Sequence, residues 1–191
     1  MQITKEQLLA IMPGARQRAE KYVAPLNAAM AEFGITTKLQ VAAFLAQCGH
    51  ESGQLLYTRE LASGSAYDLR ADLGNTNPMA IAIAKAHGST PGRYFKGRGI
   101  IQTTGYNNYV LTMMKLGIDC VEHPELLESP ENACRSAGLF WQINNLNAYA
   151  DIGDIDGVSD KVNKGRKTKA YGDTNGWADR LAIYNRAMKI L

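Results

Sequence analysis

The chain reads Gln47-Cys48-Gly49-His50-Glu51-Ser52-Gly53-Gln54-Leu55-Leu56-Tyr57-Thr58-Arg59-Glu60 at the point that decides its fold. Two glutamates stand nine residues apart, Glu51 and Glu60. On one continuous helix, about 100° per residue would turn their carboxylates to opposite sides. An apolar run precedes Glu51, and glycines such as Gly53 commonly end helices. We therefore expect Glu51 in the last turn of a buried helix and Glu60 on a segment that folds back.

Two carboxyl groups on separate elements suit glycoside hydrolysis. An inverting glycosidase needs one protonated carboxyl for the leaving oxygen and one ionised carboxylate to activate water, about 6.5–9.5 Å apart. Burial raises the pKa of a carboxyl, so Glu51, beside the apolar helix, is the candidate acid. Glu60 follows Arg59 in a more polar segment and is the candidate base. The pair alone is weak evidence, because most such glutamates are solvated surface charges.

A second stretch, from Gly97 to Tyr109, combines glycines with neutral polar side chains. Gln102, Thr104 and Asn108 suit sugar hydroxyls, N-acetyl groups and a positioned water molecule. Tyr94, just before this stretch, offers a flat face for a sugar ring. The alternative is a polar loop in which asparagine and glycine serve turns.

Helical patterns occupy most of the chain. Thr4 to Gln7 reads as a capping box for a helix through Met12. Further helices are expected over residues 15–33 with Pro25 inside, 38–51 as the central buried helix, 78–87, 106–116, 130–143, 156–162 and from about 176 onward. Ile100-Ile101 suggests a short extended piece, and residues 163–167 a basic turn. Trp141, Trp177 and Tyr184 are expected in the core, whereas Arg180 by residue type alone is a surface residue.

Composition excludes several classes of protein. The 191 residues suit one domain with two lobes at most, and 46% apolar content is enough for a core. The net charge of +3 helps binding to an anionic polymer but is far below a nucleic-acid footprint. No apolar run is long enough for membrane insertion, and no secretory signal is visible at the start.

Cysteines and histidines point to no metal site or cofactor. Cys48, Cys120 and Cys134 have no metal-ligand spacing and are expected as free thiols in a reducing compartment. His50-Glu51 lacks the second histidine of a zinc helix. Cys48 and His50 would point about 200° apart on a helix, which disfavours a thiol dyad.

Taken together, these pieces resemble the family 19 glycoside hydrolases, the chitinase-like group of the lysozyme superfamily, and particularly its bacteriophage endolysins. The matching blocks are residues 42–53, 59–61, 94–109, 136–141, 162–165 and 179–181. Lys164 departs from the family, which commonly has glycine after its asparagine. The interval between the glutamates is short, as in the endolysin branch.

The resemblance implies a mainly α, lysozyme-like two-lobed helical domain with at most a small β element and a catalytic groove between the lobes. Residues 1–191 would form a single catalytic domain with no separate wall-binding domain. The implied catalytic residues are Glu51 as general acid, Glu60 as general base and Thr104, which holds the attacking water. The implied and candidate substrate-binding residues are His50, Tyr94, Gln102, Asn108, Asn163 and Arg180.

The implied reaction is inverting hydrolysis of β-1,4 bonds between amino sugars of peptidoglycan, with chitin second, without metal or cofactor. The enzyme would be a monomer that collects in the host cytoplasm until a holin releases it to the wall. The alternatives are a lytic transglycosylase, a chitinase and a non-catalytic glycan-binding module. The sequence leaves open which of the two glycosidic bonds is cut.

Overall fold

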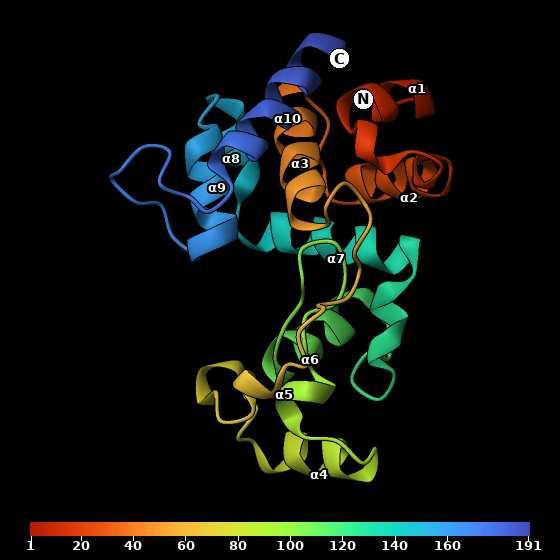
Figure 1. The fold of residues 1–191 in the computed structure, drawn as a ribbon, viewed down its shortest axis with the longest axis vertical. Coiled ribbons are helices and arrows are strands. Elements are labelled where there is room, and N and C mark those ends of the chain that lie inside the picture. Colours follow the sequence, from red (N-terminus) through yellow and green to blue (C-terminus); the bar gives the residue numbers. More distant parts are fainter. The chain divides into compact units, whose positions relative to one another are not determined.

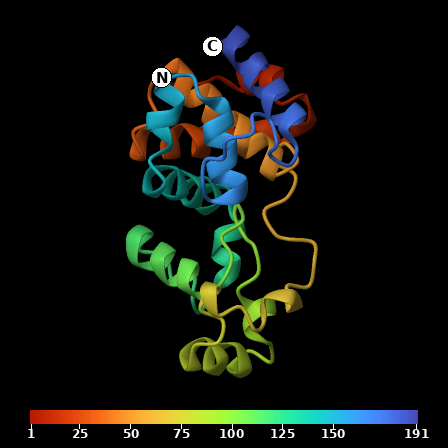
Figure 2. The ribbon, with the colours of Figure 1, turned by 90° about the vertical axis from the view of Figure 1, so that its left-hand side faces the viewer.

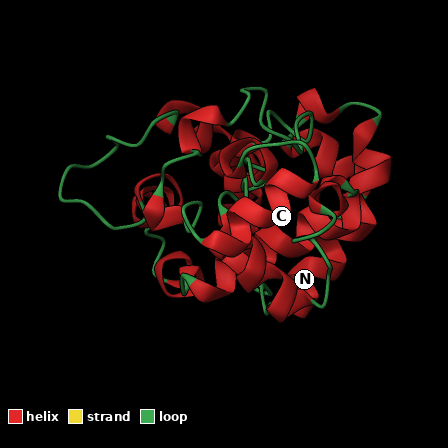
Figure 3. Cartoon of the chain, turned by 90° about the horizontal axis from the view of Figure 1, so that it is seen from below, coloured by secondary structure: helices red, strands yellow, loops and turns green.

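The computed structural model describes all residues, 1–191, in two compact units. Unit 1 comprises residues 1–57 and 137–191, and unit 2 comprises residues 58–136. The predicted mainly helical class is confirmed, since helices and loops make up the chain (Figure 3). The β structure consists of two isolated bridges, Arg59 with Arg98 and Arg98 with Thr103. None of the helices combines the length and the apolar character that crossing a membrane requires.

Unit 1 is built around one buried helix. Ten residues of α3 are buried, and α3 packs against α10, α8 and α9 (Figures 1 and 2). Thr37 starts α3 with a capping box to Gln40, and Trp141 packs edge-on against Phe44. The helices of this unit are α1 (Lys5–Ile11), α2 (Arg18–Glu32), α3 (Lys38–Glu51), the end of α7 (Pro130–Ile143), α8 (Leu146–Asp151), α9 (Ile155–Lys164) and α10 (Trp177–Ile190).

The predicted end of the central helix is confirmed. Glu51 is the last residue of α3, and Ser52 follows as its C-cap. Gly53, Gln54 and Leu55 all have positive φ angles, of 57°, 57° and 68°. The hydroxyl of buried Ser52 donates to the Cys48 carbonyl and accepts from the Leu55 amide, at 2.6 and 2.8 Å. The chain therefore turns sharply directly after Glu51.

Unit 2 packs around an aromatic cluster. The ring of buried Phe95 lies 4.9 to 5.3 Å, centroid to centroid, from the rings of Tyr94, Tyr106 and Tyr109. The helices of this unit are α4 (Pro78–Ala86), α5 (Pro91–Tyr94), α6 (Tyr106–Leu116) and the start of α7, with short 3-10 turns at Ser65–Tyr67, Ala71–Leu73 and Pro124–Glu128.

Some local predictions were wrong. Ile100 and Ile101 lie in a turn rather than an extended piece, because Gly99 and Gln102 at its ends have positive φ angles of 83° and 48°. The predicted basic turn starts late, since α9 continues to Lys164 and ends at Gly165. The helices α5 and α8 were not predicted, because they are too short to show a period.

Three side-chain burials also differ in part from expectation. Trp141 is buried as predicted, but Trp177 and Tyr184 are only half-buried. Arg180 has 1% of its surface exposed, although its residue type suggested a surface position. The three cysteines are free thiols, as expected, and all three are buried.

Candidate active site

Glu51 is oriented by a buried arginine in unit 1. Nη2 of Arg180 donates to Oε1 of Glu51, and Nη1 donates to Oε1 of Gln47, one helical turn earlier on α3. Nε2 of Gln47 donates in turn to Oγ of Ser159 on α9, at 3.1 Å. The Arg180 side chain is 1% exposed and the Glu51 side chain 23%. The carboxylate is thus accessible to solvent but fixed in direction by a planar, permanently charged donor.

His50 precedes Glu51 and is held from α10. Its Nδ1 lies 2.8 Å from Oδ2 of Asp179, one residue before Arg180. A Cβ atom at Gly176 would overlap the His50 ring, and Gly176 has a φ angle of 71°. Glycine at this position therefore serves both the turn into α10 and the close approach of the imidazole.

Asn163 supports the main chain near Arg180 rather than Glu51 itself. Its Oδ1 accepts from the Asn175 amide at 3.3 Å. The Asn175 carbonyl accepts from Nε of Arg180 at 3.1 Å. Unit 1 therefore brings together His50, Glu51, Asn163 and Arg180, four of the predicted site residues.

Glu60 is held in unit 2 by neutral donors. Its Oε1 accepts from the hydroxyl of Tyr67 at 3.0 Å, and its Oε2 accepts from the amide of Gly97 at 3.1 Å. The Glu60 amide donates back to the Gly97 carbonyl at 2.9 Å. Partial burial and the hydrogen bond to Glu60 raise the pKa of Tyr67, so its hydroxyl stays protonated as a donor.

Gly97 also links Glu60 to the stretch of residues 97–109, which we call the polar loop. A Cβ atom at Gly97 would lie 2.7 Å from Oε1 of Gln102 and 3.2 Å from Oγ1 of Thr104. Thr104 donates to the Gln102 carbonyl at 2.8 Å, and Nδ2 of Asn108 donates to the Thr104 carbonyl at 2.7 Å. Unit 2 therefore gathers Glu60, Gln102 and Thr104 around one glycine, and Asn108 is bonded to the Thr104 carbonyl.

Tyr94 is packed inside unit 2. It is 9% exposed, its hydroxyl donates to the Glu122 carbonyl at 2.7 Å, and its ring stacks on His87. Burial raises the pKa of Tyr94 to about 12. These contacts favour a packing role over the predicted stacking against a sugar ring.

Sequence reasoning missed three residues of these networks. Gln47 precedes Glu51 by four residues in an otherwise apolar helix, and this spacing was a readable signal. Tyr67 gave none. Arg98 anchors the loop of Gly97, because it donates to the Tyr94 carbonyl at 2.7 Å, to the Tyr109 hydroxyl at 3.0 Å and to Glu128 at 2.9 Å.

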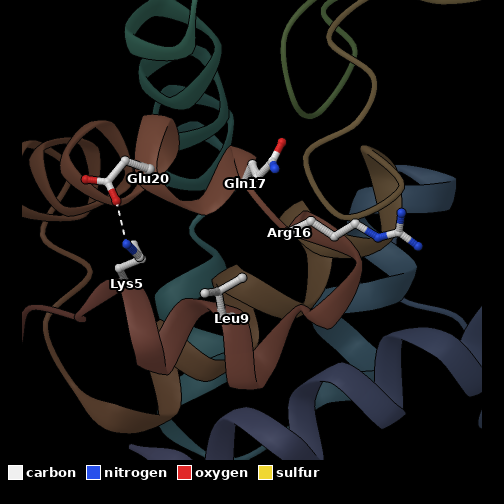
Figure 4. Close-up of a pocket in the computed structure, with 5 residues that line it drawn as sticks. All are labelled: Lys5, Leu9, Arg16, Gln17 and Glu20. Atoms are coloured by element: carbon white, nitrogen blue, oxygen red, sulfur yellow. Dashed lines mark hydrogen bonds and ion pairs between the residues drawn. The ribbon is translucent and has the colours of Figure 1, made fainter.

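A hollow elsewhere in unit 1 contains none of the predicted site residues. It is lined by Lys5, Leu9, Arg16, Gln17 and Glu20, with Lys5 and Glu20 paired at 2.7 Å (Figure 4). No three His, Cys, Asp or Glu side chains are grouped so that they could hold a metal ion.

Known proteins resemble this chain over most of its length. A glycosyl hydrolase family 19 domain-containing protein of Haemophilus influenzae is 26% identical over 183 residues, or 85% of this chain and 86% of that protein. An endochitinase of Arabidopsis thaliana is 31% identical over 126 residues, or 65% of this chain, which spans only 40% of that relative. The structure of chitinase C from Streptomyces griseus HUT6037 has a TM-score of 0.69 at 22% identity, covering 98% of this chain and 76% of that one. This last likeness shows the fold alone.

A family model described as "Chitinase class I" matches residues 21–150. The matched segment spans more than half of the chain. It contains both glutamates and the polar loop with Gln102, Thr104 and Asn108. On this match, the chain belongs to glycoside hydrolase family 19.

Proposed function

We propose that this protein is an endolysin-type glycosidase that hydrolyses β-1,4 bonds between amino sugars of bacterial peptidoglycan with inversion. The observation that carries the proposal is the way in which both glutamates are held. Glu51 is bound by Arg180, and Glu60 by Tyr67 and the Gly97 amide. Solvated surface glutamates would not be oriented in this way, by a buried guanidinium at Glu51 and by two neutral donors at Glu60.

In this reaction Glu51 is the general acid. It donates a proton to the glycosidic oxygen as the bond from that oxygen to the anomeric carbon breaks. Glu60 is the general base and removes a proton from the water whose oxygen attacks the anomeric carbon from the opposite face. One water molecule is consumed, and the sugar leaves with a free, inverted anomeric hydroxyl.

The polar loop supplies the neutral contacts of the proposal. The Thr104 hydroxyl donates its proton to the Gln102 carbonyl. The lone pairs of the hydroxyl oxygen are therefore able to accept a hydrogen bond from the attacking water. The side chains of Gln102 and Asn108, which are half-buried and exposed, bind sugar substituents in this proposal. In unit 1, His50 is held by Asp179, the neighbour of Arg180, and Asn163 accepts from the Asn175 amide, whose carbonyl accepts from Arg180.

Chitin hydrolysis is the second candidate. The plant relative is named an endochitinase and the Streptomyces griseus structure is a chitinase, which favours this substrate. The net charge of +3 favours an anionic polymer such as peptidoglycan instead. In the endolysin proposal, which rests on the resemblance to that branch, the enzyme gathers in the host cytoplasm and reaches the wall after a holin opens the membrane.

Mass spectrometry of the fragments released from purified peptidoglycan tests the proposal. Fragments with a hydrated reducing end are expected, and a 1,6-anhydro end would indicate a lytic transglycosylase. Release from colloidal chitin alone would indicate a chitinase. Pelleting with the glycan without any release, in the wild type and in Glu51→Gln alike, would indicate a binding module.

A further inference from the structure

The segment of residues 165–176, between α9 and α10, is tied to α9 by two buried aspartates (Figures 1 and 2). Oδ1 of Asp156 accepts from the Gly172 amide at 2.7 Å, and Oδ2 accepts from Lys167 at 2.8 Å. Asp160 has 0% of its surface exposed. It accepts from the amide and hydroxyl of Thr168, at 2.8 and 2.9 Å, and from the hydroxyl of Thr174 at 2.9 Å.

A short path leads from Asp160 to Glu51 within unit 1. Thr174, 4% exposed, directly precedes Asn175, whose carbonyl accepts from Nε of Arg180 at 3.1 Å. The same guanidinium donates to Glu51. The main chain at Asn175 is therefore fixed on one side by the bond between Asp160 and Thr174, and it fixes Arg180 on the other.

We propose that Asp160 is a positioning residue for Glu51, which it sets through Thr174, the Asn175 carbonyl and Arg180. It touches neither Glu51 nor substrate. The inference rests on the proposed role of Glu51 as general acid.

The carboxylate of Asp160 stays ionised at neutral pH. Burial opposes the ionisation of Asp160, but hydrogen bonds from Thr168, Thr174 and Lys164 outweigh it and lower the pKa of Asp160 to about 2. The nearest cation is Nζ of Lys164 at 3.2 Å. Asp160 therefore holds Thr174 with a charge-assisted hydrogen bond, which is stronger than a neutral one.

The test compares two threonines bonded to the same carboxylate. Thr174→Val removes the hydroxyl next to Asn175, Thr174→Ser retains it, and Thr168→Val removes a hydroxyl at the far end of the segment. Nitrogen-15 NMR reports hydrogen exchange of the Arg180 Nε–H group without any substrate. We expect this exchange to be about tenfold faster in Thr174→Val, as for the loss of one charge-assisted hydrogen bond, and near the wild-type rate in Thr174→Ser and Thr168→Val.

The kcat values of the same variants, measured on the glycan that the wild type hydrolyses, should rank the variants in the same order as the exchange rates. In Thr174→Val we expect kcat to fall about tenfold, with KM nearly unchanged because no sugar contact is lost. Equal exchange rates in Thr174→Val and Thr168→Val would overturn the inference, as would wild-type exchange in Thr174→Val. If Thr174→Val does not fold, Asp160→Asn serves instead, with faster exchange expected and wild-type exchange overturning the inference. A wild type without hydrolytic activity would remove the proposed function but leave the exchange result valid.

Discussion

The two units hold their glutamates by different means. In unit 1, buried Arg180 directs its guanidinium at Glu51. Unit 2 also buries an arginine, but Arg98 directs its donors at Tyr94, Tyr109 and Glu128, none of which is a candidate catalytic carboxylate. Glu60 relies on a main-chain amide and a phenol instead. A buried arginine can thus orient a candidate catalytic carboxylate directly, as Arg180 does, or fix the backbone that holds one, as Arg98 does.

The largest effect is expected for Glu60→Gln. Glutamine keeps one oxygen acceptor for Tyr67 or Gly97 but cannot take a proton from water, so kcat should fall by about a thousandfold or more. Initial rates on peptidoglycan measure the loss, with circular dichroism to verify the fold. A nearly active variant that forms 1,6-anhydro ends would contradict the base role of Glu60.

The comparison of the two arginines is sharpened by Arg180→Lys and Arg98→Lys. Lysine keeps the positive charge but lacks the planar guanidinium group that donates to three acceptors in different directions. We therefore expect each variant to lose about 3 kcal/mol of unfolding free energy. Only Arg180→Lys loses the direct donor to Glu51, so its kcat should fall further than that of Arg98→Lys. Urea unfolding and initial rates measure both quantities. A larger fall in kcat for Arg98→Lys would show that the backbone route matters more.

Gly176→Ala tests the crowding around His50. Its matched control is Gly165→Ala, which has a similar φ angle, 73° against 71°, but no atom within 4 Å of the added Cβ. The control should lose about 1 kcal/mol of unfolding free energy from backbone strain, and Gly176→Ala about 2 kcal/mol because the methyl group overlaps the imidazole. Equal losses in thermal unfolding would mean that the ring moves aside freely.

The last expected effect is a pH dependence due to Asp160. Its pKa is lowered from 3.8 to about 2 in the folded chain. The resulting stabilisation, about 2 kcal/mol at most, is complete above pH 4 and is lost as the pH falls through 2. Urea unfolding between pH 2 and 5 should show this loss in the wild type and not in Asp160→Asn. Parallel curves for the two proteins would show that Asp160 does not supply it.

Local signals in the sequence predicted the helix that carries Glu51. The residues that precede Glu51 are apolar on nearly every face, and Gly53 follows as the expected stop. The structure confirms the end of the helix, with Ser52 as its C-cap, and adds a capping box of Thr37 with Gln40 at its start. These are properties of neighbouring residues, so they need no knowledge of the fold. The same holds for α6, whose predicted bounds at Tyr106 and Leu116 are confirmed.

The tertiary structure decided what surrounds each glutamate. Residue type made Arg180 a surface residue, yet it is buried because Gln47, Asn175 and Glu51 satisfy its donors from other segments. Tyr67 reaches Glu60 across a loop with no period of its own. The sequence alone determined the longer helices and the two carboxylates, because helix caps and apolar periods are local. The donor to Glu51 comes from a residue 129 positions away in the chain, and only folding brings such residues together.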